Sequence, residues 1–234
     1  MTPKRAEKIN AVLSLRQPDL TLIADCVHKA RNLAAIVRSC DAVGVGDIHA
    51  VMSADEFKPY RGTAMGSNQW VDMHIHNNSE QAIVAVKQQG MQLIVADSGD
   101  KNGQPFDTVD YTCPTAIVMG GEIDGVSAYS YEQADALIYI PMVGMVESFN
   151  VSVAAAIILN EARAQRQRAG LYQQTRINHA SYQRLFFRWG YPRLANFCDS
   201  RGIPYPTILS NGDIDDPEGR WRREAKALEV APEC

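Results

Sequence analysis

Short apolar runs recur along the first 140 residues and indicate buried β-strands. A run of four to eight apolar or β-branched residues, bounded by polar or turn residues, is typical of a strand inside a sheet. Five runs fit this description: Leu20–Ala24, Ile48–Met52, Gln92–Ala96, Thr115–Met119 and Ala136–Ile140. Residues Trp70–Ile75 alternate between apolar and polar side chains, which predicts a strand with one exposed face.

Amphipathic segments lie between these runs and predict helices. The clearest stripe consists of Leu33, Ile36, Val37, Cys40 and Val43, which recur at the three- and four-residue spacing of a helix face. Arg38 lies off this stripe, Asn32 is a candidate cap at its start, and Gly44 ends it. Further helices are expected over residues 3–16, Ser79–Gln89, Val151–Ala169 and Pro217–Val230. Ser79 is the expected cap of the helix that ends at Gln89. Ser148 and Asn150 can cap the helix that begins at Val151.

Strands that alternate with helices predict an α/β fold, with a mainly parallel sheet and helices on both of its faces. After Gly170 the composition becomes polar and aromatic, so we place the end of this domain near that residue. We therefore predict a helical N-terminal extension over 1–19, an α/β domain over 20–170 and a C-terminal extension over 171–234.

Composition favours a cytoplasmic protein. No apolar run approaches the roughly 18 residues that a membrane span needs, and no secretory signal is evident. The five cysteines are scattered and form no C-x-x-C pair, which favours reduced thiols. His74 and His76 share one face of a predicted strand, but no third ligand accompanies them, so we expect a structural role and no metal.

Charge is distributed unevenly along the chain. The net charge is −4, yet residues 1–40 carry +4 and residues 161–193 carry +6, around an acidic middle of −11 over 41–160. Every charged residue from 163 to 193 is an arginine, and six aromatic residues are interleaved with them. Such a run is often only a solvated helix surface, but arginine forks onto phosphate and stacks on bases, which favours RNA. The candidate RNA-binding residues are Arg5, Arg16, Arg163, Arg166, Arg168 and Arg176.

Three motifs appear in an order that resembles one family. They are Asn32-Leu-Ala-Ala-Ile-Val-Arg38, Ile117-Val-Met-Gly-Gly-Glu-Ile-Asp-Gly125 and Ile140-Pro-Met-Val-Gly-Met-Val-Glu-Ser-Phe-Asn-Val-Ser-Val-Ala154. Together they resemble the motifs of the SPOUT-class RNA 2′-O-methyltransferases of the SpoU/TrmH type. Shorter stretches, such as Arg16–Thr21, Asp41–Val45, Gly66–Asn68 with Trp70-Val71, and Gly90–Gln92, resemble the bacterial members that act on a tRNA guanosine.

The resemblance implies a deep trefoil knot in the C-terminal part of the α/β domain, and S-adenosyl-L-methionine as the cofactor. In the family, three loops that follow strands meet in the knot and hold this cofactor. Glycine in such loops lets the backbone approach the adenine and ribose closely. The positions that match are Ala96, Gly120, Gly121, Gly125, Ile140, Met142, Gly144, Met145 and Phe149. Gly121 departs from the family, which usually has Asn or Gln there.

The resemblance also implies catalytic roles for Asn32, Arg38, Glu122, Ser148 and Asn150. The attacking ribose 2′-hydroxyl must lose its proton, and some accounts make the arginine the base. A neutral guanidinium at pH 7 costs about 8–9 kcal/mol, so we expect Arg38 to act as a charged clamp on phosphate and developing alkoxide, with the proton leaving to phosphate or water.

By resemblance, the reaction is 2′-O-methylation of guanosine 18 in the D-loop of tRNA by a homodimer. Two alternatives stay open. One is a 2′-O-methyltransferase that acts on ribosomal RNA, and the other is a non-catalytic RNA-binding factor.

Overall fold

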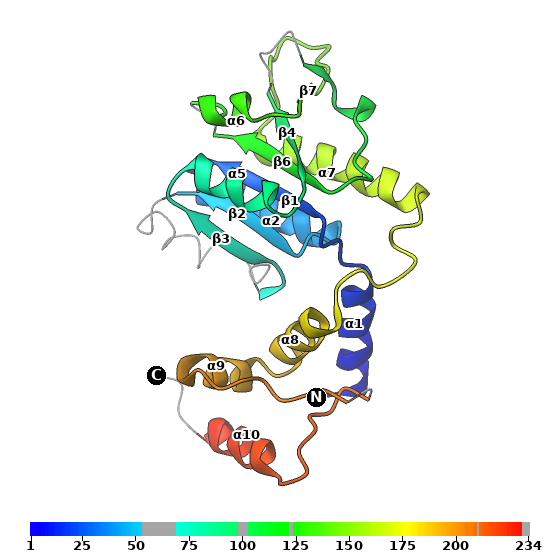
Figure 1. Ribbon diagram of the computed structural model, residues 1–234, viewed down its shortest axis with the longest axis vertical. Coiled ribbons are helices and arrows are strands. Elements are labelled where there is room, and N and C mark those ends of the chain that lie inside the picture. Colours follow the sequence, from blue (N-terminus) through cyan, green and yellow to red (C-terminus); the bar gives the residue numbers. More distant parts are fainter. Residues whose placement is uncertain (53–68, 98–102, 122–123, 210, 231–234) are drawn as a thin grey trace. The chain divides into compact units, whose positions relative to one another are not determined.

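The computed structural model describes residues 1–52, 69–97, 103–121, 124–209 and 211–230 (Figure 1). Two sequence-derived assignments, Glu122 and the Gly66–Asn68 stretch, lie outside these residues. Contacts divide the chain into two compact units. One unit is formed by residues 17–173, and the other combines residues 1–16 with 174–234.

A seven-stranded sheet forms the centre of the unit 17–173. All of its pairings are parallel, and the strand order is β3-β2-β1-β6-β4-β7-β5. The strands are β1 (Leu20–Asp25), β2 (Asp47–Val51), β3 (Asp72–His76), β4 (Gln92–Ala96), β5 (Gln104–Pro105), β6 (Thr115–Gly120) and β7 (Ala136–Tyr139). The predicted α/β class and all six predicted strands are confirmed. The trefoil knot remains a prediction that rests on the family resemblance.

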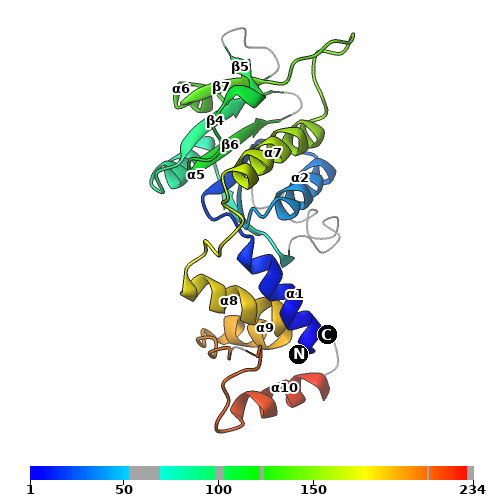
Figure 2. The same ribbon diagram turned by 90° about the vertical axis from the view of Figure 1, so that its right-hand side faces the viewer.

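Helices cover both faces of this sheet, as Figures 1 and 2 show. Two separate core clusters reflect the alternation of side chains along each strand. Leu22 and Ala24 of β1 belong to the cluster that includes Ile36 and Ile158, whereas Ile23 belongs to the cluster that includes Ile83. Helices α2 (Ala30–Ala42) and α7 (Val151–Arg168) therefore cover one face. Helix α5 (Ser79–Lys87) covers the other, where α6 (Ala128–Glu132) lies beside it. A short 3-10 turn, η2, spans Phe106–Thr108.

The predicted caps are wrong for two of these helices. Helix α2 begins at Ala30, so Asn32 lies inside its first turn, where it is buried and can contact another element. The cap of α5 is Asn78, whose side chain accepts from the Gln81 N–H. Ser79 is buried and donates instead to Asp25 at 2.6 Å. For α7 the cap Asn150 is confirmed, since its side chain accepts from the Ser152 N–H.

Arg166 is a core residue, which makes its assignment to RNA wrong. Its side chain is fully buried near the end of α7. The guanidinium donates to the Asp19 carboxylate at 2.7 Å and to Gln17 Oε1 at 3.1 Å. It also donates to the carbonyl oxygens of Asp19, Tyr111 and Cys113. The charge is paired and hydrogen-bonded, as a buried charge must be.

Replacing Arg166 by alanine should destabilise the protein by about 3–5 kcal/mol, because Asp19 and three carbonyl groups would lose their buried partner. Arg168→Ala is the matched control on the same helix. Its side chain is 69% exposed and reaches Glu161 only at 3.4 Å, so its loss should cost below about 1 kcal/mol. Urea unfolding of both variants measures the difference. Equal losses would show that Arg166 does not hold the core.

Three histidines lie together on β2 and β3. The Nδ1 atom of His49 and the Nε2 atom of His76 are 2.8 Å apart, and His74 Nε2 lies 2.9 Å from Asp47 Oδ1. Burial, reinforced by the charges of His74 and His76, lowers the pKa of His49 from 6.5 to about 4. The contact between His49 and His76 needs one donor and one acceptor, so at least one of these two imidazoles must be neutral. No group of three metal-ligating side chains suited to an ion occurs within the described residues.

The free energy of unfolding should therefore fall as the pH drops from 6.5 through about 4. The unfolded chain takes up a proton at His49 near pH 6.5, whereas the folded chain resists it until about pH 4. This group contributes up to about 3 kcal/mol, which is present above pH 6.5 and lost below pH 4. Denaturant titrations at several pH values should give a flatter profile for His49→Gln than for the wild type. The exposed His28→Gln variant should keep the wild-type slope.

The second unit is helical in its regular elements. Helix α1 (Pro3–Ser14) packs on α8 (His179–Gly190), and α9 (Pro192–Arg201) contacts both α8 and α10 (Arg220–Val230). The predicted helices over 3–16 and 217–230 are confirmed with slightly different bounds, whereas α8 and α9 were not predicted. Within the described residues, no helix is long and apolar enough to cross a membrane.

Two arginines of this unit are engaged by Trp189. Arg16 is buried, with its guanidinium carbon 5.1 Å from the centroid of the Trp189 ring. Contrary to the prediction, it is therefore not available to RNA. Arg5 is exposed, and its Nη2 donates to the Trp189 carbonyl oxygen at 2.8 Å. Both arginines therefore help to hold α1 against α8.

Candidate functional site

Three neighbouring strands end at the same edge of the sheet. Ala96 at the end of β4 is aligned with Met119 of β6 on one side and with Ile138 of β7 on the other. Because the pairings are parallel, the loops that follow all three strands start side by side. The crevice at the carboxyl ends of such strands is where open α/β sheets bind ligands.

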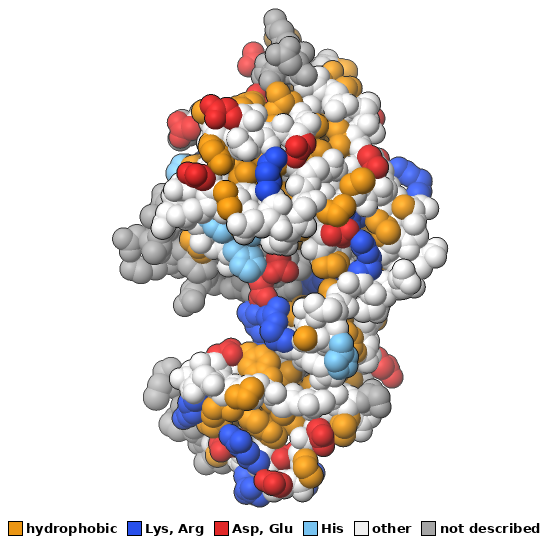
Figure 3. All heavy atoms as spheres, in the orientation of Figure 1, with side chains coloured by type: hydrophobic (Ala, Val, Ile, Leu, Met, Phe, Trp, Pro, Cys, Tyr) orange, Lys and Arg blue, Asp and Glu red, His pale blue; other side chains and the backbone are white. Residues whose placement is uncertain are grey.

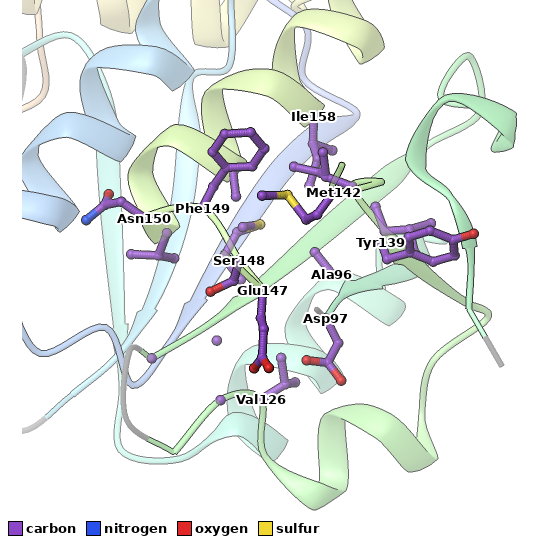
Figure 4. A pocket seen from close by; sticks show the side chains of 18 of the residues that line it. Ala96, Asp97, Val126, Tyr139, Met142, Glu147, Ser148, Phe149, Asn150 and Ile158 are labelled. Carbon is purple, nitrogen blue, oxygen red and sulfur yellow. The ribbon is translucent and has the colours of Figure 1, made fainter. Parts of the chain in front are cut away.

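These loops line a cavity of about 560 Å³, a size typical of a site for a small molecule or cofactor (Figure 4). The lining includes most of the predicted cofactor residues: Ala96, Gly120, Gly121, Gly125, Ile140, Met142 and Phe149. Gly144 and Met145 are not part of it. They lie on the loop between β7 and α7, where the Met145 side chain is fully exposed.

Three charged side chains at this cavity, those of Lys29, Asp97 and Glu147, were not predicted. Asp97 directly follows β4 and accepts a hydrogen bond from the Tyr131 hydroxyl. Figure 4 shows that the carboxylates of Asp97 and Glu147 both point toward the part of the cavity near Val126. Lys29, just before α2, also lines the cavity. Asp97 could have been found by reading one residue past the strand end, since ligand-binding side chains gather there.

The glycines bring the backbone of two loops into close contact. Gly121 and Gly125 exchange two backbone hydrogen bonds of 3.0 and 3.1 Å. A Cβ atom on Gly121 would lie 2.2 Å from the Cys26 carbonyl oxygen, and one on Gly120 would lie 2.4 Å from the Gly125 carbonyl carbon. Gly125 has a positive φ of 68°. The Asn or Gln that the family usually has at position 121 therefore does not fit here unless the Cys26 backbone moves.

Two predicted catalytic residues meet beside the cavity. Asn150 Nδ2 donates to Asn32 Oδ1 at 3.3 Å, which links the first turns of α7 and α2. The same Asn150 side chain accepts from Ser152 Oγ at 2.7 Å. Asn150 and Ser148 both line the cavity. Asn32 was predicted as a cap, but its side chain has this tertiary partner instead.

Arg38 is not brought into this cavity. It is exposed on α2, six residues after Asn32, which corresponds to roughly 9 Å along a helix. The helix thus has the buried Asn32 beside the cavity and presents a guanidinium to solvent. Of the remaining RNA candidates, Arg168 is exposed, Arg163 and Arg176 are partly exposed, and Arg163 donates to Asn160 and Gln167.

The donor set of the cavity suits an adenosine-type ligand with a charged tail. Gly120 and Gly121 give backbone access for a base edge or ribose, Ile140 and Met142 form apolar walls, and the carboxylates of Asp97 and Glu147 can accept from hydroxyl or ammonium groups. S-adenosyl-L-methionine has a base, a ribose with hydroxyl groups and an ammonium group on its amino-acid tail, so the residues present fit it.

Gly121→Ala should weaken binding of this cofactor at least about tenfold and lower stability, because the new methyl group meets backbone and not a movable side chain. Gly144→Ala is the matched control on the exposed loop, where a Cβ would meet nothing within 4 Å. Calorimetric titration with S-adenosyl-L-methionine and thermal unfolding should separate the two variants. Normal binding by Gly121→Ala would contradict the close packing at Cys26.

Comparison with known proteins gives two family matches. Residues 19–160 match the profile of the SpoU rRNA Methylase family, and residues 164–217 match that of the SpoU rRNA methylase C-terminal region. A relative from Escherichia coli, a tRNA (guanosine(18)-2′-O)-methyltransferase, is 43% identical over 223 residues, or 94% of this chain and 97% of the relative. An enzyme of the same name from Thermus thermophilus is 44% identical over 80% of this chain and 96% of its own.

Solved structures agree with these matches. The A. aeolicus TrmH/SpoU tRNA modifying enzyme superposes with a TM-score of 0.73 at 38% identity, covering 81% of this chain and 96% of its own. The SpoU methyltransferase AviRb from Streptomyces viridochromogenes, in complex with the cofactor AdoMet, gives a TM-score of 0.58 at 25% identity over 64% of this chain and 59% of its own.

Proposed function

The chain belongs to the SpoU rRNA methylase family, and from that premise we propose that it transfers a methyl group from S-adenosyl-L-methionine to the ribose 2′-oxygen of guanosine 18 in the D-loop of tRNA. The observation that carries this proposal is the cavity at the ends of β4, β6 and β7, which combines the predicted cofactor loops with Ser148 and Asn150. The two tRNA enzymes above, which cover 80% or more of this chain, support the substrate. We place the reaction in the cytoplasm, where tRNA is available.

Ribosomal RNA is less well supported as the substrate. A 23S rRNA (guanosine-2′-O-)-methyltransferase RlmB from Vibrio parahaemolyticus is 35% identical, but over only 68% of this chain and 64% of its own. The Escherichia coli tRNA enzyme matches nearly the whole chain at higher identity. Because RNA-binding regions determine which RNA is accepted, the longer match favours tRNA.

The chain's own residues supply binding and positioning. S-adenosyl-L-methionine would be held by Gly120, Gly121, Ile140 and Met142. When bound, it would supply a methyl group activated by its sulfonium, and its sulfur would become a neutral thioether after the transfer. The Asn32–Asn150 pair would orient the ribose beside Ser148. Arg38 would stabilise the phosphate and the developing alkoxide as a fixed positive charge, and the proton would leave to phosphate or water.

A second copy of the chain would complete the site. Arg38 is exposed and outside the cavity lining, although the proposed chemistry needs it at the ribose. Beside the cavity, Val143, Met145 and Val146 of the β7–α7 loop and Val153 of α7 expose large apolar side chains. Exposed apolar groups that gather in this way mark an interface more often than a free surface. We therefore infer a homodimer formed through this loop.

Arg38→Ala should lower methyl transfer by at least about a hundredfold, because charge stabilisation in the transition state is lost. Affinity for S-adenosyl-L-methionine should stay near the wild-type value, since Arg38 does not line the cavity. Arg31→Ala, which removes another exposed arginine of α2, is the control and should stay active. The assay uses labelled cofactor and two tRNA transcripts, one with guanosine 18 and one with 2′-deoxyguanosine there. Equal labelling of both transcripts would contradict the proposed function.

A Val143→Asp, Met145→Asp double variant should be monomeric where the wild type is dimeric, because two charges would have to be buried at the interface. Multi-angle light scattering at micromolar concentration measures the mass directly. Val84→Asp places a charge at another exposed apolar residue, on α5, and should not change the mass. A wild type that is already monomeric would refute the dimer.

A further inference from the structure

The unit formed by residues 1–16 and 174–234 contains a cavity of its own. It has a volume of about 820 Å³ and lies between α8 and the segment 203–207. Its lining belongs to this unit alone, so it is separate from the cavity at the sheet edge. None of the sequence-derived site residues lies in it.

Side-chain contacts fix the walls of this cavity. Gln183 of α8 makes two hydrogen bonds with Ile208, donating to its carbonyl oxygen at 3.1 Å and accepting from its N–H at 2.8 Å. The ring of Tyr205 packs on Phe187 with centroids 4.7 Å apart. Ile208 and Phe187 are buried. The 203–208 segment is therefore held against α8 in a defined position, with two prolines beside Tyr205.

The charged side chains of the lining are two arginines and one aspartate. Arg184 and Arg188 lie one turn apart on α8, and His179 lies at the beginning of the same helix. Asp199 is the one acidic group among the lining residues, and it accepts from the Tyr205 hydroxyl at 2.6 Å. Figure 3 shows basic side chains beside exposed hydrophobic ones on this unit. The cavity thus combines two guanidinium groups with an aromatic ring and apolar proline walls.

We propose that this cavity binds an unpaired nucleotide of the substrate tRNA, with its phosphate at Arg184 and Arg188 and its base against the wall formed by Tyr205, Pro204 and Pro206. Guanidinium forks match phosphate, and single-stranded RNA is held by stacking its bases on aromatic side chains. The volume exceeds what a free phosphate ion needs, and the apolar wall gives a base a place to lie. The proposal rests on the proposed function only for the identity of the RNA.

The test uses a double variant in which Arg184 and Arg188 are both replaced by alanine. Its affinity for tRNA is compared with that of the wild type over a range of salt concentrations. The double variant should bind about tenfold more weakly, as expected for lost charged hydrogen bonds. The slope of log K against log salt concentration should become shallower by roughly 0.7 for each phosphate contact that is lost. The control is Arg201→Ala in the same unit. Arg201 is exposed, lies over the Phe197 ring at 4.1 Å and is not part of the lining, so its loss should have little effect.

A second variant separates a shaped site from a diffuse charge. Arg184→Lys, Arg188→Lys keeps both charges but loses the planar fork, so its affinity should fall between the wild type and the alanine variant. Thermal unfolding confirms that each variant is folded, and calorimetry should show unchanged binding of S-adenosyl-L-methionine. If the lysine variant equals the wild type, or the alanine variant equals Arg201→Ala, the proposed nucleotide site is overturned.

Methyl transfer measured on the same samples keeps the two proposals apart. At saturating tRNA the alanine variant should keep its kcat while its KM for tRNA rises. A wild type that binds tRNA through this cavity without methylating it would contradict the proposed function alone. A wild type that methylates tRNA, together with an alanine variant of unchanged KM, would contradict the nucleotide site alone.

Discussion

The parallel pairing of β4 with β6 and β7 is the constraint on which the rest of the site depends. Parallel neighbours must run in the same direction, so their carboxyl ends meet at one edge, and here Ala96, Met119 and Ile138 are aligned there. Packing on both faces fixes this alignment, because a shift by one residue would exchange the side chains that the two core clusters receive, such as Ile94 in one cluster and Val95 in the other. The three loops that form the cavity therefore begin side by side.

Buried polar groups then fix the helices around that edge. Asp25, at the end of β1, is fully buried and accepts from the hydroxyl groups of Ser79 and Ser130 and from the Ser127 N–H. It thereby holds the beginnings of α5 and α6 near the Gly121 loop. On the other face, Arg166 anchors the end of α7, and the Asn32–Asn150 contact joins its beginning to α2. Both ends of α7 are thus held by polar contacts, which positions Ser148 and Asn150 at the cavity.

The strands were predictable from the sequence, because an apolar run indicates a buried strand wherever its partners lie. Most of the residues that line the cavity at their ends were identified through the family resemblance. Features that depend on a tertiary partner were not. Arg166 looked like one more surface arginine, and only the fold reveals Asp19 beside it. Asn32 looked like a cap because its partner Asn150 is 118 residues away. Helix α8 was missed because its aromatic residues, of which Tyr182 and Phe186 pack on each other, were interpreted as contacts for RNA.

The most direct test of this account is a crystal structure with S-adenosylhomocysteine, the product form of the cofactor, prepared after treatment with a chelator. We predict that its adenosine lies among the loops that follow β4, β6 and β7, against Gly120, Gly121 and Ile140, with its amino-acid tail toward Asp97 or Glu147 and no metal ion in contact. A ligand bound elsewhere, or a protein that binds none at millimolar concentration, would contradict the assignment of the cavity.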